Sequence, residues 1–332
     1  MKSPAPLFDA VEAFFVDHLK LARGCSPCTL RSYRDTLRLL FEHAARVRDL
    51  AVDRLRIEDF DADLILAFLN HLEEDRHNRI STRNCRLAAL RSFFVHLLRR
   101  HPEHAGRLAR IVALPPKRHP PAPPRYLDPP DVQLLLRHPD RNTPVGRRDF
   151  ALILFLYNTG ARVSEATAVH GRDLLPGPAV HLCGKGKKER VSPLWPQTNA
   201  AIKALSPAPI DPERPVFRNL RGRGLTRHGI HHILTHHAAA LHRADSRFPK
   251  RVWPHLLRHS CAVGMLQSGV DLVTIRDQLG HVSVATTGRY ATSNLALKRA
   301  ALEAFWAATG MSAPKRNRWR LTPKLSQFLQ SI

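Results

Sequence analysis

Acidic residues are scarce in this sequence of 332 residues, which has 28 Asp and Glu against 52 Lys and Arg. The formal net charge is +24 and the isoelectric point is near 11.1. Such a deficit of negative charge makes a polyanion the expected partner, because every phosphate that a cation neutralises releases condensed counterions. RNA-binding proteins of the ribosomal type share this excess, so the charge alone does not identify the polyanion.

Long apolar runs are also absent. No stretch approaches the roughly eighteen consecutive apolar residues needed to cross a bilayer. The segment Met1–Ala10 has one Lys and no apolar run of the signal-peptide kind. We therefore expect no membrane partner, no export and a cytoplasmic location. The hydrophobic share of 43% is typical of a folded protein and not of a disordered one.

Cysteines are few and odd in number, and they are scattered along the chain: Cys25, Cys28, Cys85, Cys183 and Cys261. Cys25 and Cys28 form a lone C-x-x-C without a second pair. This pattern favours small buried residues in a reducing compartment over a zinc or redox site. The 20 histidines lie mostly among arginine-rich segments and lack ligand spacing. We therefore predict no metal and no cofactor.

Residues 1–114 favour a bundle of helices. Their apolar residues recur at spacings of three and four, and Ser26-Pro27 is typical of a helix start. Further starts are expected near Asp61 and Ser81. The apolar stripes are Phe8, Val11, Phe15 and Leu19; Leu30, Tyr33, Leu37 and Leu40; Leu64, Phe68 and Leu72; and Leu87, Leu90, Phe94 and Leu97. The opposite faces carry the cations that suit a bundle laid against DNA: Arg31, Arg34, Arg38, Arg83, Arg86 and Arg91.

A proline-rich segment follows this bundle. Between Leu114 and Asp131 the sequence reads PPKRHPPAPPRYLDPP, which cannot continue a helix and favours an extended connector. We predict an interdomain linker over residues 115–130 that crosses a phosphate backbone. A plain spacer would explain the prolines but not the basic charge.

A second domain is expected over residues 131–310, followed by a basic tail at 311–332. Arg147–Tyr157 is dense in apolar residues, which predicts a buried helix that stops near Gly160. Ala179–Leu194 reads as two short strands around a basic turn. Further helices are expected at 226–242, 254–268, 271–279 and 294–308.

Four short segments of this domain carry candidate chemistry: TGARVSE (159–165), GKGKKER (184–190), HLLRHS (255–260) and LGHVSVATTGRY (279–290). Each is weak alone. In this order and at these separations they resemble the motifs of the tyrosine recombinases, the family of phage integrases and bacterial Xer-type resolvases. SPCTLRSYRDTLRLLFEH and STRNCRLAALRSFF resemble helices of that family's core-binding domain. The resemblance covers most of residues 8–308.

The resemblance implies a mainly α fold with a small β-sheet, arranged as a two-domain DNA clamp. Residues 1–114 would form the helical, SAM-like core-binding domain, and 131–310 the mixed α/β catalytic domain. It also implies double-stranded DNA as partner and a homo-tetramer in the synaptic complex. The helix at 294–308 packs either into a neighbouring protomer or on its own domain, and the sequence favours neither. Accessory recombinase or DNA-bending proteins are compatible with the basic surface.

Two arginines are expected to hold the phosphate that reacts. Attack on a phosphodiester builds negative charge on its non-bridging oxygens, and a planar guanidinium offers those oxygens two parallel donors. By resemblance, Arg162 and Arg258 take this role. Glu165 matches an acidic residue of the family motif that would support the site. His259, beside Arg258, is expected to be structural.

The remaining candidates handle protons and the covalent step. The resemblance makes Lys185 the general acid for the 5′-hydroxyl that leaves, with Lys187 and Lys188 as close rivals. It makes His255 a proton-handling partner near the nucleophile and His281 a hydrogen-bond donor to the phosphate. Tyr290, nine residues after His281, would attack phosphorus and form a 3′-phosphotyrosine, without metal or nucleotide.

Three other functions stay open from the sequence alone. A type IB topoisomerase would share the chemistry and reseal the same strand. A DNA-binding regulator without catalysis would explain the charge and the helices. An RNA-binding protein of the ribosomal type would explain the charge only. The sequence does not choose between movement of a phage, insertion sequence or transposon and resolution of DNA dimers, nor does it reveal the DNA site.

Overall fold

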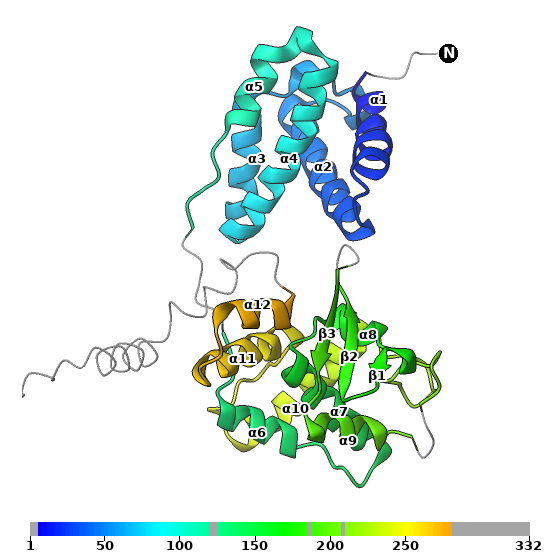
Figure 1. Ribbon diagram of the computed structural model, residues 1–332. Coiled ribbons are helices and arrows are strands. Elements are labelled where there is room, and N and C mark those ends of the chain that lie inside the picture. The colour runs from blue at the N-terminus through cyan, green and yellow to red at the C-terminus, as the bar shows by residue number, and fades with distance from the viewer. Residues whose placement is uncertain (1–5, 120–124, 185–187, 207–209, 281–332) are drawn as a thin grey trace, which may run out of the picture. The chain divides into compact units, whose positions relative to one another are not determined.

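The computed structural model describes residues 6–119, 125–184, 188–206 and 210–280 (Figure 1). The chain divides into two compact units, Met1–Pro121 and Ala122–Ile332. Helices dominate both units, and the second unit contains a three-stranded sheet. The predicted fold class, mainly α with a small β-sheet, is therefore confirmed.

The first unit is a helical bundle. It contains α1 (Pro6–Ala13), a π-helix (Phe14–Ala22), α2 (Pro27–Arg48), α3 (Ala62–Glu74), α4 (Ile80–Arg100) and α5 (Ala105–Ala113), with 3-10 turns at Val52–Arg54, Ile57–Asp59 and Pro102–His104. The predicted helix starts are confirmed. The Ser26 hydroxyl accepts the Thr29 N–H at 3.3 Å, and the Asp61 carboxylate accepts the Leu64 N–H at 2.7 Å. Each satisfies an N–H that the first turn of a helix leaves without a partner.

The predicted apolar stripe at the N-terminus is wrong in part. Leu19 is buried, but Phe8 is 64% exposed, and Leu7 and Phe14 enter the core instead. The π-helix explains the difference, because it bonds five residues apart where an α-helix bonds four apart. A stripe spaced for α-helix therefore does not stay on one face across Phe14–Ala22.

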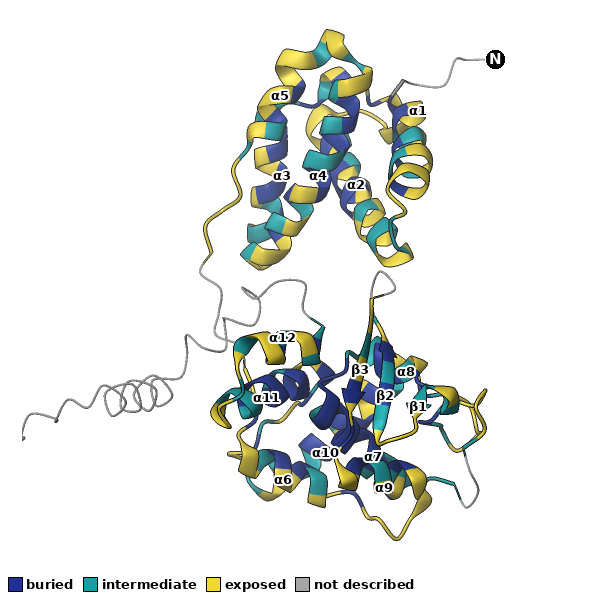
Figure 2. Ribbon diagram, viewed as in Figure 1, coloured by how far each residue is buried: buried dark blue, intermediate teal, exposed yellow. Residues whose placement is uncertain are grey.

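The later stripes do face the core. Figure 2 shows the buried sides of α2, α3 and α4 turned toward one another. Their buried members are Leu37, Leu40, Leu64, Phe68, Leu72, Leu87, Leu90, Phe94 and Leu97, while Leu30 and Tyr33 are half-buried against the same core.

Two arginines expected on the open face of the bundle turn inward. Arg83 is buried and pairs with Glu73 at 2.8 Å. Arg91 is half-buried and donates to the carbonyl of Leu114. A long arginine side chain can bury its apolar stem while its head reaches an acceptor, so an arginine on a helix does not by itself mark an exposed face. Arg31, Arg34 and Arg38 are exposed, as expected.

The second unit places helices around a small sheet (Figure 1). Its helices are α6 (Pro129–Arg137), α7 (Pro144–Thr159), α8 (Val163–Ala168), α9 (Pro196–Lys203), α10 (Arg227–Ala244), α11 (Pro254–Gln267) and α12 (Leu272–Leu279), with a 3-10 turn at Gly171–Asp173. Its strands are β1 (Leu174–Leu175), β2 (Ala179–Cys183) and β3 (Glu189–Pro193), antiparallel in the order β1-β2-β3. The sequence missed β1, because two residues are too few for a period of two to show.

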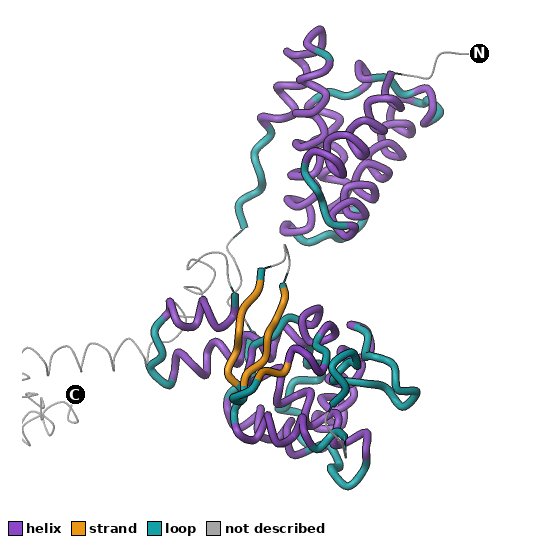
Figure 3. The backbone as a smooth tube through the Cα atoms, turned by 45° about the vertical axis from the view of Figure 1, so that its right-hand side comes forward, coloured by secondary structure: helices purple, strands orange, loops and turns teal. Residues whose placement is uncertain are grey.

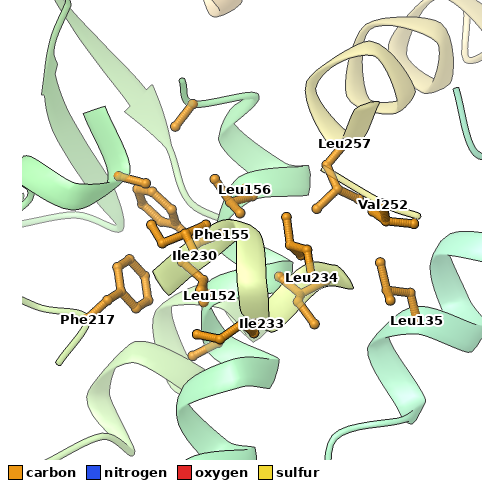
Figure 4. Close-up of a cluster of buried hydrophobic side chains, with 14 of the residues drawn as sticks. Leu135, Leu152, Phe155, Leu156, Phe217, Ile230, Ile233, Leu234, Val252 and Leu257 are labelled. Atoms are coloured by element: carbon orange, nitrogen blue, oxygen red, sulfur yellow. The ribbon is translucent and has the colours of Figure 1, made fainter. Parts of the chain in front are cut away.

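The core of the second unit surrounds α7. Figure 4 shows Leu152, Phe155 and Leu156 of this helix among side chains from α10 and the segment entering α11. The Phe155 ring lies 5.2 Å from the Phe217 ring, centroid to centroid, and is fully buried. The helix predicted at Arg147–Tyr157 is thus confirmed, and its burial explains why apolar residues occupy nearly all its sides.

The first residues of the second unit are tied to α11. The Leu127 N–H donates to the Ser260 hydroxyl at 2.8 Å, and the Leu127 side chain lies in the core. Helix α11 packs against α7 and α12, and the tube of Figure 3 shows α11 and α12 side by side. Helix α11 therefore has a fixed position from which to present His255 and Arg258.

Several expectations concern parts of the chain that the structure does not describe. These are Lys185, His281, Tyr290, the helix at 294–308, the tail at 311–332 and the middle of the proline-rich segment. Within the described ranges, no helix is long and apolar enough to span a membrane.

Candidate active site

The site begins where α7 ends. Gly160 closes the helix with φ of +58°, a left-handed conformation that glycine adopts without penalty. A Cβ on Gly160 would stand 2.3 Å from the Leu279 Cδ2, so a side chain does not fit there. This close approach brings the end of α7 against the end of α12.

Arg162 follows two residues later and caps α8. Its backbone N–H donates to Glu165 Oε2 at 2.9 Å, and its Nη1 donates to Glu165 Oε1 at 2.7 Å. Its Nη2 donates to the carbonyl oxygen of Gly280 at 3.0 Å. Two of these bonds fix the plane of the guanidinium, which remains partly open to solvent.

Arg258 reaches the same place from α11. Its side chain is buried; Nη1 donates to the carbonyl of Gly160 and Nη2 to the carbonyl of Leu279, both at 2.6 Å. Leu279 and Gly280 are adjacent residues, so the structure brings the two predicted arginines together at the C-terminal end of α12. That end carries partial negative charge, which stabilises the cations it contacts.

His255 lies on α11, one turn before Arg258. It is exposed at the surface of the unit. Desolvation, then the positive charges of Arg258 and Arg162, lower the pKa of His255, while Glu165 acts in the opposite direction. The charges that act on His255 are those of the arginine site, so this histidine lies within electrostatic range of both arginines.

His259 is half-buried on the next turn of α11. Desolvation, followed by the charges of His255 and Arg258, lowers its pKa to about 4. A ring with so low a pKa stays neutral at physiological pH.

The β2–β3 hairpin also touches this site. Its last described pair is closed by the Gly184 N–H, which donates to the carbonyl of Lys188 at 2.7 Å. A Cβ on Gly184 would stand 2.8 Å from Glu165 Oε1 and 3.5 Å from Arg162 Nη1. The hairpin therefore leads directly from the Arg162–Glu165 pair into residues 185–187, which lie outside the described residues. Lys188 is exposed.

The sequence reading missed Arg190 of β3. Its Nη2 donates to Glu165 Oε2 at 2.9 Å, so Glu165 lies between two arginines. The register of the β2–β3 pair could have revealed that Arg190 points inward. Arg190 pairs with Leu182 and Ser192 with Val180, and opposite residues of an antiparallel pair share one face. Because Val180 and Leu182 are buried, Arg190 and Ser192 must also point inward.

The charges of this site suit an anion. The guanidinium groups of Arg162 and Arg190 bond the buried carboxylate of Glu165, and the third guanidinium group, that of Arg258, meets Arg162 at the end of α12. Within the described part of the chain, no group of three or more His, Cys, Asp or Glu could hold a metal ion. An oxygen of a phosphodiester is the kind of ligand that such an excess of fixed donors attracts.

Comparison with known proteins identifies both units. The phage integrase family model matches residues 125–296, and the model of the phage integrase N-terminal SAM-like domain matches residues 13–101. The putative integrase/recombinase y4rC of Sinorhizobium fredii is 39% identical over 336 residues, covering 100% of both chains. Tyrosine recombinase XerC of Pelobacter propionicus is 35% identical over 293 residues, covering 86% of this chain and 91% of the relative.

Solved structures share the fold. The XerH recombinase bound to its palindromic difH substrate aligns with a TM-score of 0.64 at 20% identity, covering 93% of this chain and 91% of XerH. The Tn1549 transposon integrase in complex with transposon right end DNA aligns with a TM-score of 0.66 at 14% identity, covering 89% and 98%. With family models on both units and a relative that matches the whole chain, this protein belongs to the phage integrase family of tyrosine recombinases.

Proposed function

We propose that this protein is a site-specific DNA recombinase that cuts and rejoins double-stranded DNA through a 3′-phosphotyrosyl link to Tyr290. The observation that carries the proposal is the meeting of Arg162 and Arg258 at the end of α12. From that end the chain continues through His281 to Tyr290. Two fixed guanidinium groups therefore lie where the segment that contains the candidate nucleophile begins.

The arginines bind and polarise the scissile phosphate. Backbone carbonyls and Glu165 hold Arg162 and Arg258 in place before DNA arrives. Donors that are already oriented stabilise the charge of the pentacoordinate transition state without reorganising, usually the largest single term in such catalysis. Two of the five guanidinium N–H groups of Arg162 bond to Glu165 and Gly280, which leaves three toward a bidentate contact with phosphate.

Proton transfer completes the reaction. The Tyr290 oxygen bonds to phosphorus, the bond from phosphorus to the 5′-oxygen breaks, and the tyrosine proton goes to His255. The lowered pKa of His255 keeps its ring neutral near pH 7, as a proton acceptor must be. Lys185, next to Gly184 on the hairpin, gives its proton to the 5′-oxygen that leaves. His281, next to Gly280, donates a hydrogen bond to the phosphate.

The same intermediate explains rejoining. The phosphotyrosyl bond conserves the energy of the broken phosphodiester, so the 5′-hydroxyl of a second strand can displace Tyr290 without a metal or nucleotide cofactor. We propose that the two units clamp double-stranded DNA, with residues 115–130 as linker, and that four protomers join two sites. The full-length similarity to a relative named integrase/recombinase supports the movement of a mobile element as the biological task.

The test is strand exchange between two duplexes. Nicked duplex fragments tiled across the flanks of the gene would carry one label, and a second set with free 5′-hydroxyl ends another. The proposal predicts a product that carries both labels from one fragment pair, formed in EDTA. Relaxation of a supercoiled plasmid that carries the same flanks, without exchange between the fragments, would instead indicate a topoisomerase, and tight binding without cleavage would indicate a regulator.

A further inference from the structure

The side chain of Arg190 links three elements of the second unit: β3, α8 and α12. It belongs to β3; its Nη2 donates to Glu165 Oε2 of α8 at 2.9 Å, and its Nε donates to the carbonyl of Gln278 in α12 at 2.9 Å. The side chain is only 10% exposed. Its contacts are therefore with the protein and not with solvent.

Arg190 keeps Glu165 ionised. The Glu165 side chain is fully buried, and burial by itself would raise the pKa of its carboxyl. The hydrogen bond and charge of Arg190, and after them the bonds to Arg162, outweigh burial and lower this pKa below its ordinary value. A protonated Glu165 would lose most of its attraction for Arg162, so Arg190 indirectly holds the orientation of Arg162.

Arg190 also fixes the exit of α12. The helix ends at Leu279 and is followed by Gly280 with φ of +63°, and a Cβ on Gly280 would stand 3.2 Å from Arg190 Nη1. The neighbouring Gln278 side chain donates to the Ser192 hydroxyl at 2.7 Å, so β3 and the last turn of α12 are joined twice. The carbonyls that Arg162 and Arg258 use, those of Gly280 and Leu279, belong to this same short stretch.

The hairpin is fixed by the same residue. Arg190 lies opposite Leu182, and the next pair toward the turn is Cys183 with Glu189. Beyond that pair, Gly184 and Lys188 close the loop that contains the candidate general acid Lys185. Any shift of Arg190 along β3 therefore moves Gly184 and Lys188, the two ends of this loop, relative to Arg162.

We infer that Arg190 is a positioning residue for the cleavage reaction: through its bonds to Glu165 and to the Gln278 carbonyl it aligns the hairpin and the exit of α12 on the Arg162–Glu165 pair. This inference rests on the proposed function for its kinetic consequences. The effect of Arg190 on the pKa of Glu165 can be measured without any cleavage activity.

The experiment uses the full chain with Arg190→Gln and Arg190→Lys. Arg172→Gln is the matched control, because Arg172 also pairs with a glutamate, Glu213 at 2.5 Å, but on the exposed surface. Circular dichroism checks folding. Single-turnover formation of the covalent adduct on nicked duplex measures cleavage, and a fluorescein-labelled duplex measures affinity. Carbon-13 NMR of the labelled Glu carboxyls, assigned with Glu165→Gln, measures the pKa of Glu165.

We expect Arg190→Gln to cleave about 100-fold more slowly, the loss typical of a misplacement of about 1 Å, with unchanged affinity for DNA. The pKa of Glu165 should rise, so the rate of this variant should fall as the pH is lowered through the new pKa. The wild type and Arg190→Gln/Glu165→Gln should show only the loss of rate that protonation of His255 causes, without this additional fall. A substrate with a 5′-thiolate leaving group should recover part of the rate, because the hairpin acid matters less there. Arg190→Lys should keep Glu165 ionised and retain an intermediate rate, since one ammonium replaces the charge but not both contacts.

Other outcomes overturn the inference. An unchanged pKa of Glu165 in Arg190→Gln would exclude the electrostatic role even if no cleavage were seen with any variant. Fully additive losses for Arg190→Gln and Glu165→Gln would show that the two residues act independently. A loss confined to DNA affinity would make Arg190 a DNA-binding residue. If Arg190→Gln does not fold, Arg190→Lys decides by the same readouts. A wild type that forms no adduct would refute the proposed function and leave the NMR result standing.

Discussion

Replacing Gly160 by alanine tests the close packing on which the arginine site depends. The substitution introduces two penalties. A Cβ in the left-handed conformation costs about 1–2 kcal/mol, and a methyl group forced against a packed neighbour costs a further ~1–3 kcal/mol. That neighbour is Leu279 Cδ2, 2.3 Å from the position of the new Cβ. We expect the free energy of unfolding of the second unit to fall by about 2–5 kcal/mol.

A second glycine separates the two penalties. Gly177 has φ of +77° and nothing within 4 Å of an added Cβ. Gly177→Ala should therefore carry only the backbone penalty of about 1–2 kcal/mol. Urea unfolding followed by tryptophan fluorescence gives the comparison, because all four tryptophans of the sequence come after the boundary at Ala122 and report on the second unit.

Cleavage should respond as well. The carbonyl of Leu279 accepts a hydrogen bond from Arg258, so displacing Leu279 moves an acceptor that orients a catalytic candidate. Gly160→Ala should slow adduct formation under conditions where the protein stays folded, whereas Gly177→Ala should not. Leu279→Ala in the Gly160→Ala background should restore part of the rate by removing the clash. Equal losses of stability at Gly160 and Gly177, or no recovery in the double variant, would refute the packing argument.

Three further predictions concern other parts of the chain. Lys185→Ala should cleave normal DNA slowly and recover on a 5′-thiolate substrate; recovery with Lys187→Ala or Lys188→Ala instead would show that another lysine is the acid. His96→Phe should make the protein less sensitive to acid, because burial lowers the pKa of His96 to about 4 in the folded protein. Above pH 6.5 this histidine is neutral in both the folded and the unfolded chain. As the pH falls toward 4 the unfolded chain takes up the proton first, and about 3 kcal/mol of stability is lost. Urea unfolding at pH 7.5 and 5 checks this, and equal losses in both proteins would contradict it. Asp149→Ala should destabilise the second unit by about 3–5 kcal/mol, because the buried carboxylate accepts from Arg148 at 2.6 Å and contacts His237 at 3.1 Å. A loss of stability no larger than that of Asp245→Ala, at an exposed aspartate, would refute this stabilising role of Asp149.

Sequence periodicity predicted much of the fold because most of its elements obey simple rules. Capping residues marked the starts of α2 and α3 at Ser26 and Asp61, and a glycine marked the end of α7. The errors occurred where a rule had an exception. The π-helix changed the periodicity after Ala13, and Arg83 found a buried partner in Glu73.

The site was only partly predictable, because motifs name residue types and not their contacts. Arg162 and Arg258 were selected by resemblance, and the structure adds that both bond to the end of α12. Arg190 was quoted within a motif but not selected, since its importance depends on strand register and on a buried carboxylate 25 residues away. Backbone carbonyls such as that of Gly160 carry no signal in the sequence at all.

The central claim, that Tyr290 forms the covalent link, has one direct test. Wild-type protein and Tyr290→Phe would be incubated in EDTA with the tiled nicked duplexes, and adducts would be separated on a denaturing gel, digested with trypsin and sequenced by mass spectrometry. We expect an adduct for wild type alone, with the DNA 3′-phosphate on the peptide that contains Tyr290. An adduct on another residue, or cleavage by Tyr290→Phe, would contradict it.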